Sequence, residues 1–248
     1  MAYDPKASTG QNVDSISPGV LGMPFITLIQ KGSAEFDESH KSHTVKKIEG
    51  CKPGSIVFAQ EKLLLARPTL VIPVAQATIY SEWKSRDQGG GFVSHRDQTI
   101  RGDKAYRAGQ PGSKDQYKEY LGNNEIIYTI YVMILFQVNK SWRKGMISFQ
   151  ATQLKHARNW LKTIANVRFK DLPDVQPPVY AATYLLDSEP ASNAHGSWFS
   201  WKITLDRVLD LTNDEALLRT AEEGSVAALA SLPQAEKRPA LQVENAPY

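Results

Sequence analysis

The residues most suggestive of chemistry are the basic and aromatic side chains between Lys140 and Lys170. This stretch holds eight Lys and Arg residues and no Asp or Glu, although the whole chain has a formal net charge of only +3. Lys and Arg neutralise phosphates and release counterions. Trp142 and Trp160 lie among them, and an unpaired base that stacks on such a ring gains about 1–3 kcal/mol. The pattern predicts a surface for single-stranded nucleic acid, or else a solvated helix face beside core aromatics.

A second unusual segment, Tyr80 to Arg96, combines three consecutive glycines with aromatic and basic residues. Glycine lets the backbone turn freely and approach a ligand closely. The glycine spacing fits neither a P-loop nor a dinucleotide-binding fingerprint. We expect a loop that closes over a nucleic-acid strand, with a flexible hairpin tip as the alternative.

A third segment, Gly196 to Asp206, alternates like a strand. Alternation places Trp198 and Lys202 on the face opposite a set of apolar residues that should be core: Phe199, Trp201, Ile203 and Leu205. We expect an exposed aromatic-plus-cation face here, unless Trp198 caps the core.

The candidate nucleic-acid-binding residues share a cationic or flat aromatic side chain within these three segments. They are Trp83, Lys84, Arg86, Phe92, Arg96, Trp142, Arg143, Lys144, Lys155, Arg158, Lys162, Trp198 and Lys202. Trp160 is a further stacking candidate. It lies nearest the inner face of its helix, so of all these residues it is the one expected to prove structural.

Signals for catalysis or for a metal are weak. His40 and His43, beside Asp37 and Glu38, have a metal-compatible spacing, but no further His or Cys nearby completes a ligand set. The single cysteine, Cys51, rules out an internal disulfide and a cysteine-based metal cluster. No Gly-x-Ser-x-Gly motif is present. We expect a protein that is not an enzyme and needs no cofactor.

One helix and several strands are expected to carry these residues. Apolar residues recur at a period of 3.6 over Gln153 to Val167, which predicts an amphipathic helix with Thr152 as its N-cap. At 100° per residue, Lys155, Arg158 and Lys162 line a stripe beside its apolar face.

Strands are expected in segments rich in β-branched and aromatic residues: Ser55–Phe58, Thr69–Tyr80, Ile126–Val138, Met146–Phe149, Tyr180–Leu186 and Ser197–Leu205. Pro73 indicates an edge position or a bulge, and Lys140 to Gly145 suggests a hairpin turn. Many strands around one central helix predict a mainly β (α+β) fold. The expected form is an antiparallel β-barrel of the OB-fold type with a C-terminal helix.

The expected organisation is a flexible arm over 1–22, a β-rich single-stranded nucleic-acid-binding domain over 23–210, a C-terminal helix over 211–232 and a mobile tail over 233–248. Residues 81–125 are expected as a long loop excursion from the domain. The chain shows neither a signal-peptide pattern nor an apolar run long enough to cross a bilayer, so no membrane partner and a cytoplasmic location are expected.

The order of five segments resembles early proteins of tailed bacteriophages: Pro24–Gln30, Ile48–Gly54, Glu82–Val93, Gln153–Trp160 and Gly196–Lys202. The resemblance implies single-stranded DNA binding in phage replication or recombination, in the host cell cytoplasm. Phage or host replication and recombination proteins, or further copies of this chain in a homo-oligomer, are the protein partners to test. By analogy with phage helix-destabilising proteins it also implies an OB-type barrel.

Two alternatives remain open. A phage structural or host-interaction protein would bind another protein and show negligible affinity for oligonucleotides. A recombination protein that anneals complementary strands would assemble into rings or filaments on DNA.

Overall fold

Two long antiparallel strands form the spine of the molecule. The computed structural model describes residues 24–40, 42–85, 92–113, 118–194 and 196–230. Strands β4 (Thr69–Trp83) and β8 (Asn124–Val138) pair from Val71↔Phe136 to Trp83↔Glu125. Their middle parts are almost continuously buried, because helices cover both faces of the sheet there.

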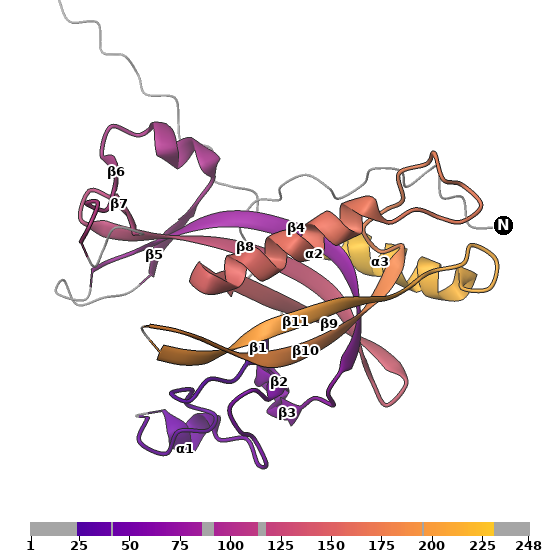
Figure 1. Cartoon of the computed structure of the whole chain (residues 1–248), viewed down its shortest axis with the longest axis horizontal. Helices are drawn as coiled ribbons and strands as arrows, with labels where there is room; N and C mark the ends of the chain where they lie inside the picture. Colours follow the sequence, from indigo (N-terminus) through magenta and orange to yellow (C-terminus); the bar gives the residue numbers. More distant parts are fainter. Residues whose placement is uncertain (1–23, 41, 86–91, 114–117, 195, 231–248) are drawn as a thin grey trace, which may run out of the picture.

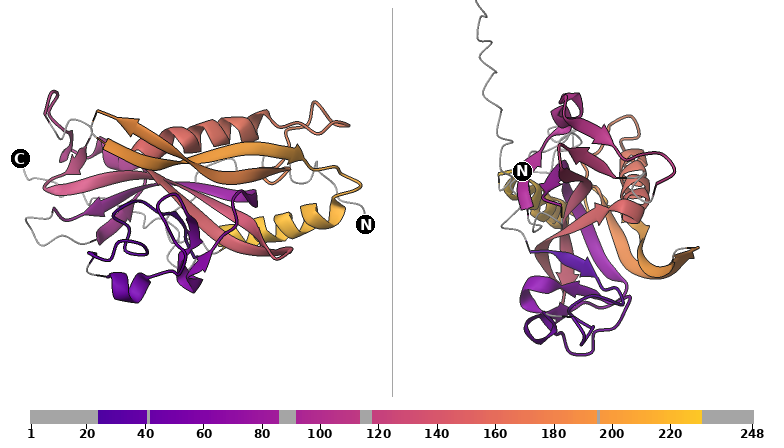
Figure 2. Two further views of the ribbon diagram at one scale, coloured as in Figure 1. Left: turned by 60° about the horizontal axis from the view of Figure 1, so that its bottom comes forward. Right: turned by 90° about the vertical axis from the view of Figure 1, so that its left-hand side faces the viewer.

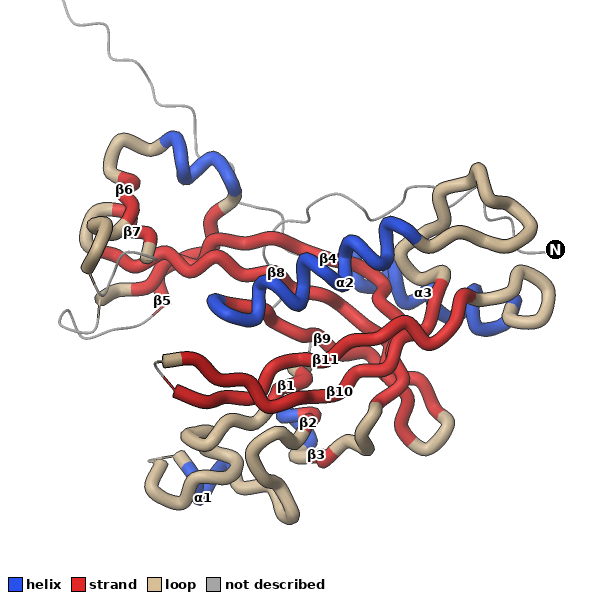
Figure 3. Tube along the Cα trace, viewed as in Figure 1, coloured by secondary structure: helices blue, strands red, loops and turns tan. Residues whose placement is uncertain are grey.

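Five strands curl into a half-barrel in the order β9-β8-β4-β10-β11, as Figure 1 shows. Strand β9 (Ser141–Gln150) pairs with β8, while β10 (Ala182–Asn193) and β11 (Gly196–Val208) form a long hairpin that joins β4 through β10. All of these pairings are antiparallel. The expectation of a mainly β, antiparallel fold with few helices is confirmed (Figure 3).

Helix α2 (Leu154–Asn166) lies inside the curl and supplies much of its core. Its buried residues are Ala157, Trp160 and Ile164. Trp160 is 3% exposed, and its ring contacts Phe149 edge-on at 6.3 Å and Tyr184 at 5.6 Å between centroids. Trp160 is therefore a core residue, and the stacking role considered for it is wrong.

The start of α2 also differs from expectation. A 3-10 turn, η5 (Ala151–Gln153), leads into the helix, and Gln153 is the N-cap with no side-chain capping hydrogen bond. Thr152 lies inside η5 and so is not the N-cap.

The N-terminal segment lies between the two outer strands of the curl. The Met146 N–H in β9 donates to the Pro24 carbonyl at 3.0 Å, and Phe25 forms a parallel bridge to Met146. Strand β1 (Ile26–Leu28) pairs with β2 (Ile56–Phe58), which pairs with β3 (Leu63–Leu64). A short helix, α1 (His43–Lys46), and a 3-10 turn, η2 (Ala59–Glu61), complete this small sheet.

The segment expected as a loop excursion contains three short strands. Strand β5 (Phe92–Arg96) pairs with the end of β4, β7 (Glu119–Leu121) pairs with the start of β8, and β6 (Tyr106–Ala108) pairs with β7. With the 3-10 turn η4 (Gln98–Gly102) they form a lobe around Tyr80, Ile100 and Ile126, called here the distal lobe. These strands are too short to carry a periodic signal, and they gain order by pairing with the spine.

Two details of the spine bear on the expectations. The hairpin turn between β8 and β9 consists of Asn139 and Lys140, both with positive φ, so Trp142 to Lys144 lie in a strand and not in the turn. At Pro73 the register passes from Pro73↔Ile134 to Ala75↔Met133, which is a bulge with Val74 as the extra residue. The bulge is confirmed, whereas the edge position is wrong because β4 is central.

Helix α3 (Glu215–Ala230) packs on β4 and β8 from the side opposite α2 (Figure 2). Gly224 allows the close approach, since a Cβ there would lie 3.3 Å from a methyl group of Leu135. None of the described helices combines the length and the apolar character that a membrane span requires.

Candidate nucleic-acid interface

The exposed side of α2 carries the clearest concentration of positive charge. Lys155, Arg158 and Lys162, called here the α2 stripe, are all exposed, as the helical period requires. None of the three forms an ion pair with any residue that the structure describes. The Arg158 guanidinium lies 6.0 Å from the ring centroid of Tyr128 on β8. The stripe therefore combines uncompensated cations with an aromatic ring.

Arg96, another candidate, is bound to a carboxylate inside the fold. Its guanidinium lies 2.8 Å from Oε2 of Glu82, which is 4% exposed and also accepts hydrogen bonds from Asn124 at 2.6 Å and Ser94 at 3.2 Å. Burial raises the pKa of the Glu82 carboxyl, but the bonds from Asn124 and Arg96 and the Arg96 charge outweigh it and hold the pKa below its ordinary value. Arg96 thus neutralises a buried charge.

The β9 candidates lie far from the α2 stripe. Arg143 forms an ion pair with Glu61 and its guanidinium lies 4.9 Å from the ring centroid of Phe58. Trp142 is half-buried against the core, and Lys144 is exposed. Trp142 pairs with Gln137, which lies nine residues from Tyr128, or about 30 Å along strand β8 at 3.3 Å per residue. The basic stretch that is continuous in sequence is divided in space.

The glycine-rich candidates are only partly described. Trp83 ends β4 and is 38% exposed, and Lys84 follows it, also exposed. Trp83 is in register with Phe92, the first residue of β5. Arg86, the glycines 89–91 and the side chain of Phe92 lie outside the described residues.

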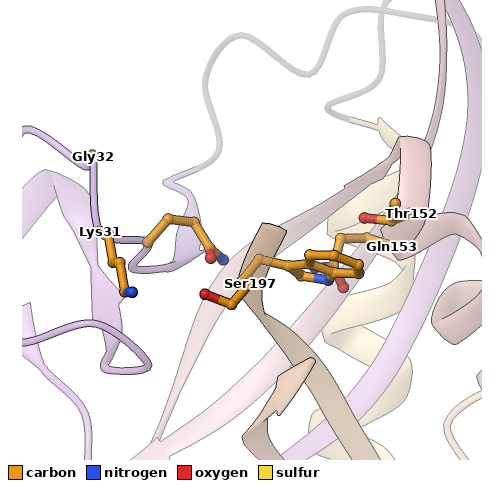
Figure 4. A pocket seen from close by; sticks show the side chains of 7 residues that line it. Lys31, Gly32, Thr152, Gln153 and Ser197 are labelled. Carbon is orange, nitrogen blue, oxygen red and sulfur yellow. The ribbon is translucent and has the colours of Figure 1, made fainter. Parts of the chain in front are cut away.

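An open pocket of about 420 Å³ lies where three distant segments meet: the turn after β1, the start of α2 and the start of β11. Figure 4 shows Lys31 on one side, Thr152 and Gln153 on the other, and Ser197 between them. The lining, called here the Trp198 pocket, comprises Gln30, Lys31, Gly32, Thr152, Gln153, Ser197 and Trp198. It contains one cation and no carboxylate.

Hydrogen bonds to one strand hold two walls of this pocket. The Gln30 side-chain amide donates to the Phe199 carbonyl at 2.9 Å and accepts from the Phe199 N–H at 2.8 Å. The Gln153 amide donates to the same Phe199 carbonyl at 3.0 Å and accepts from the Trp201 N–H at 3.3 Å. Two hydrogen bonds close the turn that has Lys31 at its tip. The Ser33 N–H donates to the Gln30 carbonyl at 3.1 Å, and the Gln30 N–H donates to the Ser33 hydroxyl at 2.8 Å.

Strand β11 follows the expected alternation only in part. Trp201 is buried, but Leu205, expected in the core, is 44% exposed because it lies near the far end of the edge strand. Trp198 is half-buried and Lys202 is exposed, opposite Asp187 of β10. Burial raises the pKa of the Asp187 carboxyl, but the Ser188 N–H, Arg67 and the charge of Lys202 hold it below its ordinary value.

Sequence reasoning missed several polar and cationic residues. Gln30, Lys31 and Gln153 join the pocket through contacts between segments more than 45 positions apart, for which a single sequence gives no signal. In the distal lobe, Arg101 lies 5.2 Å from the ring centroid of Tyr80, and Arg107 lies 4.4 Å from that of Tyr120. The interspersed Arg and Tyr residues of 101–120 are a signal that could have indicated this second group.

The histidines considered for a metal have local partners. The His40 Nδ1 accepts from the Ser42 N–H at 3.1 Å, and the His43 Nδ1 lies 3.0 Å from the Ala34 carbonyl oxygen. Within the described ranges, no group of three or more His, Cys, Asp or Glu side chains is arranged to hold a metal ion.

A comparison with protein families gives a match over most of the chain. The family model described as "Pam3 phage gp34-like protein" matches residues 1–228, almost the whole chain. Neither the curated proteins nor the solved structures contain a match to this chain.

Proposed function

The chain belongs to the Pam3 phage gp34-like protein family, and we propose that it binds single-stranded DNA with little sequence preference in phage replication or recombination. The observation that carries the proposal is the α2 stripe, whose three exposed cations have no carboxylate partner among the described residues. One of them, Arg158, also lies over the Tyr128 ring. Phosphate contacts of this kind are independent of sequence.

The contrast with the other arginines supports this choice of surface. Arg96 and Arg143 are neutralised by Glu82 and Glu61, so a bound phosphate would have to displace a carboxylate there. At the α2 stripe a phosphate replaces only water and mobile ions. Binding at the stripe therefore needs no rearrangement of the fold.

The strand order supports an OB-type barrel as the framework. In such barrels the face of strands 2 and 3, with the loops between strands 1 and 2 and between strands 4 and 5, binds oligonucleotides. In the order observed here, β8 and β9 correspond to strands 2 and 3. The distal lobe corresponds to the loop between strands 1 and 2, and the turn of the β10–β11 hairpin to the loop between strands 4 and 5. Figure 1 shows the distal lobe and the tip of this hairpin on the same side of the molecule, with the start of α2 between them.

The test is fluorescence anisotropy of a labelled dT oligonucleotide at low and moderate salt. The variant Lys155→Ala/Arg158→Ala/Lys162→Ala should bind more weakly to every sequence, and its salt slope should fall by about 0.7 for each lost phosphate contact. Lys46→Ala/Lys47→Ala/Lys62→Ala removes the same charge from exposed positions in α1 and in the turns beside β1, β2 and β3, and serves as the control.

Each outcome decides a different point. A folded wild-type protein that fails to bind at low salt would exclude single-stranded DNA binding and favour a protein-interaction role. Equal losses in the two triple variants would show that only net charge matters and that the α2 stripe is not the site.

A further inference from the structure

We propose that the Trp198 pocket holds one nucleotide of the bound strand, with the base stacked on the Trp198 indole and the phosphate at Lys31. This inference rests on the function proposed above and assigns it a specific subsite. The pocket, about 420 Å³ in volume, falls in the range of about 300–1,000 Å³ typical of small-molecule sites. A single nucleotide therefore suits it in size.

Trp198 is held in a way that leaves its ring available. The indole N–H donates to the Ser200 hydroxyl at 2.9 Å, which orients the ring along its own strand. Across the hairpin its partner is Ala191, whose methyl group covers little of an indole. The ring is half-buried and lines the pocket. An indole with its polar atom satisfied and its face at a pocket is suited to stacking on any base.

Lys31 gives the pocket its preference for an anion. It is exposed at the tip of a turn closed by Gln30 and Ser33, and it forms no ion pair with a described residue. No carboxylate lines the pocket, so a phosphate would meet one positive charge and no negative one. Further polar groups come from the hydroxyls of Thr152 and Ser197 and from the Gly32 backbone. They can form hydrogen bonds with any of the four bases and so give no base preference.

The pocket is preformed. Its two walls come from segments that lie more than 120 positions apart, yet both are bonded through Gln30 and Gln153 to the same carbonyl of Phe199. A ligand therefore need not order these walls on binding, which lowers the entropic cost. Since Thr152 and Gln153 lead directly into α2, a strand leaving the pocket reaches Lys155 within one helical turn.

The experiment compares two ligands: a labelled dT oligonucleotide, and an abasic oligonucleotide of equal length that keeps the phosphates and lacks the bases. Trp198→Ala should weaken binding of the dT strand by about five- to one-hundred-and-fifty-fold and leave the abasic strand unaffected, because stacking needs the base. Trp198→Phe should recover part of the loss. Lys31→Ala should lower the salt slope by about 0.7 with both ligands.

Thr204→Ala, an exposed substitution on the same strand, is the control, and near-UV circular dichroism checks that each variant is folded. If the wild type binds dT and Trp198→Ala binds as tightly as Thr204→Ala, the pocket assignment is overturned while the proposed function stands. Equal losses of Trp198→Ala on both ligands would also overturn it, since a base would then not be involved. A wild type that binds neither ligand refutes both proposals.

Discussion

The side chain of Gln30 bonds to Phe199 as a neighbouring strand would. Its Nε2 donates to the Phe199 carbonyl at 2.9 Å, and its Oε1 accepts from the Phe199 N–H at 2.8 Å. Strand β11 is an edge strand of the large sheet, and an open edge leaves backbone groups free to pair with another chain. Gln30 and Gln153 together satisfy Phe199 and the next outward backbone group, that of Trp201. Two amide side chains thus close the seam between β11 and the segments that follow β1 and β9.

Gln30→Ala should therefore destabilise the protein by about 1–3 kcal/mol, because it leaves the Phe199 N–H without its partner in a partly buried place. Urea unfolding followed by circular dichroism measures the loss. Gln98→Ala, at an exposed position in the distal lobe, is the matched control and should change stability by less than about 0.5 kcal/mol. Equal stability of the two variants would mean that the seam depends on other contacts.

The Glu82 cluster predicts a pH dependence. The carboxyl has a lowered pKa in the folded protein, so its stabilising contribution is complete above its unfolded value, near 4.5, and is lost as the pH falls through the folded value. Glu82→Gln should be less stable than wild type at pH 7, and this difference should shrink below pH 4.5. Urea midpoints at pH 7, 5, 4 and 3 test it.

A difference between wild type and Glu82→Gln that stays constant to pH 3 would contradict this account. Asp187 and Asp214 also have lowered pKa values, so wild-type stability alone should fall over the same acidic range. The difference in stability between wild type and Glu82→Gln at each pH cancels the contribution of Asp187 and Asp214, which is common to both proteins. Arg96→Ala should resemble Glu82→Gln at neutral pH, since it leaves the buried carboxylate with fewer partners.

Arg143 offers a test of how the basic stretch is divided. Its charge is already neutralised by Glu61, so Arg143→Ala should change the affinity for a dT oligonucleotide by no more than about twofold. Arg158→Ala, which removes an unpaired cation, should weaken binding and lower the salt slope by about 0.7. Anisotropy titrations of the two variants at two salt concentrations compare them directly. A loss in Arg143→Ala as large as that in Arg158→Ala would place the start of β9 in the site.

The long elements could be predicted because their signals are local. Strands β4 and β8 are rich in β-branched and aromatic residues, and α2 repeats its apolar residues every 3.6 positions, so the exposure of Lys155, Arg158 and Lys162 follows from the helix itself. Strand alternation likewise predicts that Trp201 is buried, and the helical period predicts that Trp160 lies near the inner face of α2.

The rest depends on contacts between distant positions. Whether Arg96 and Arg143 are free cations depends on Glu82 and Glu61, which no pattern in the sequence connects to them. The Trp198 pocket depends on Gln30 meeting a strand 169 positions away. The short strands of the distal lobe form because the spine offers unpaired edges on which they can align.

The extra residue Val74 fixes which way the far half of the spine faces. Side chains that pair across two strands lie on the same face, so Pro73 with Ile134 and Ala75 with Met133 lie on opposite faces. Beyond the bulge, each side chain of β4 therefore points to the face opposite the one that uninterrupted alternation from Pro73 would give it. Without Val74, Tyr80 and Glu82 would point to the other side of the sheet, away from Tyr128 and Arg96. One inserted residue therefore determines which face of the sheet the side chains of β4 occupy where the distal lobe begins.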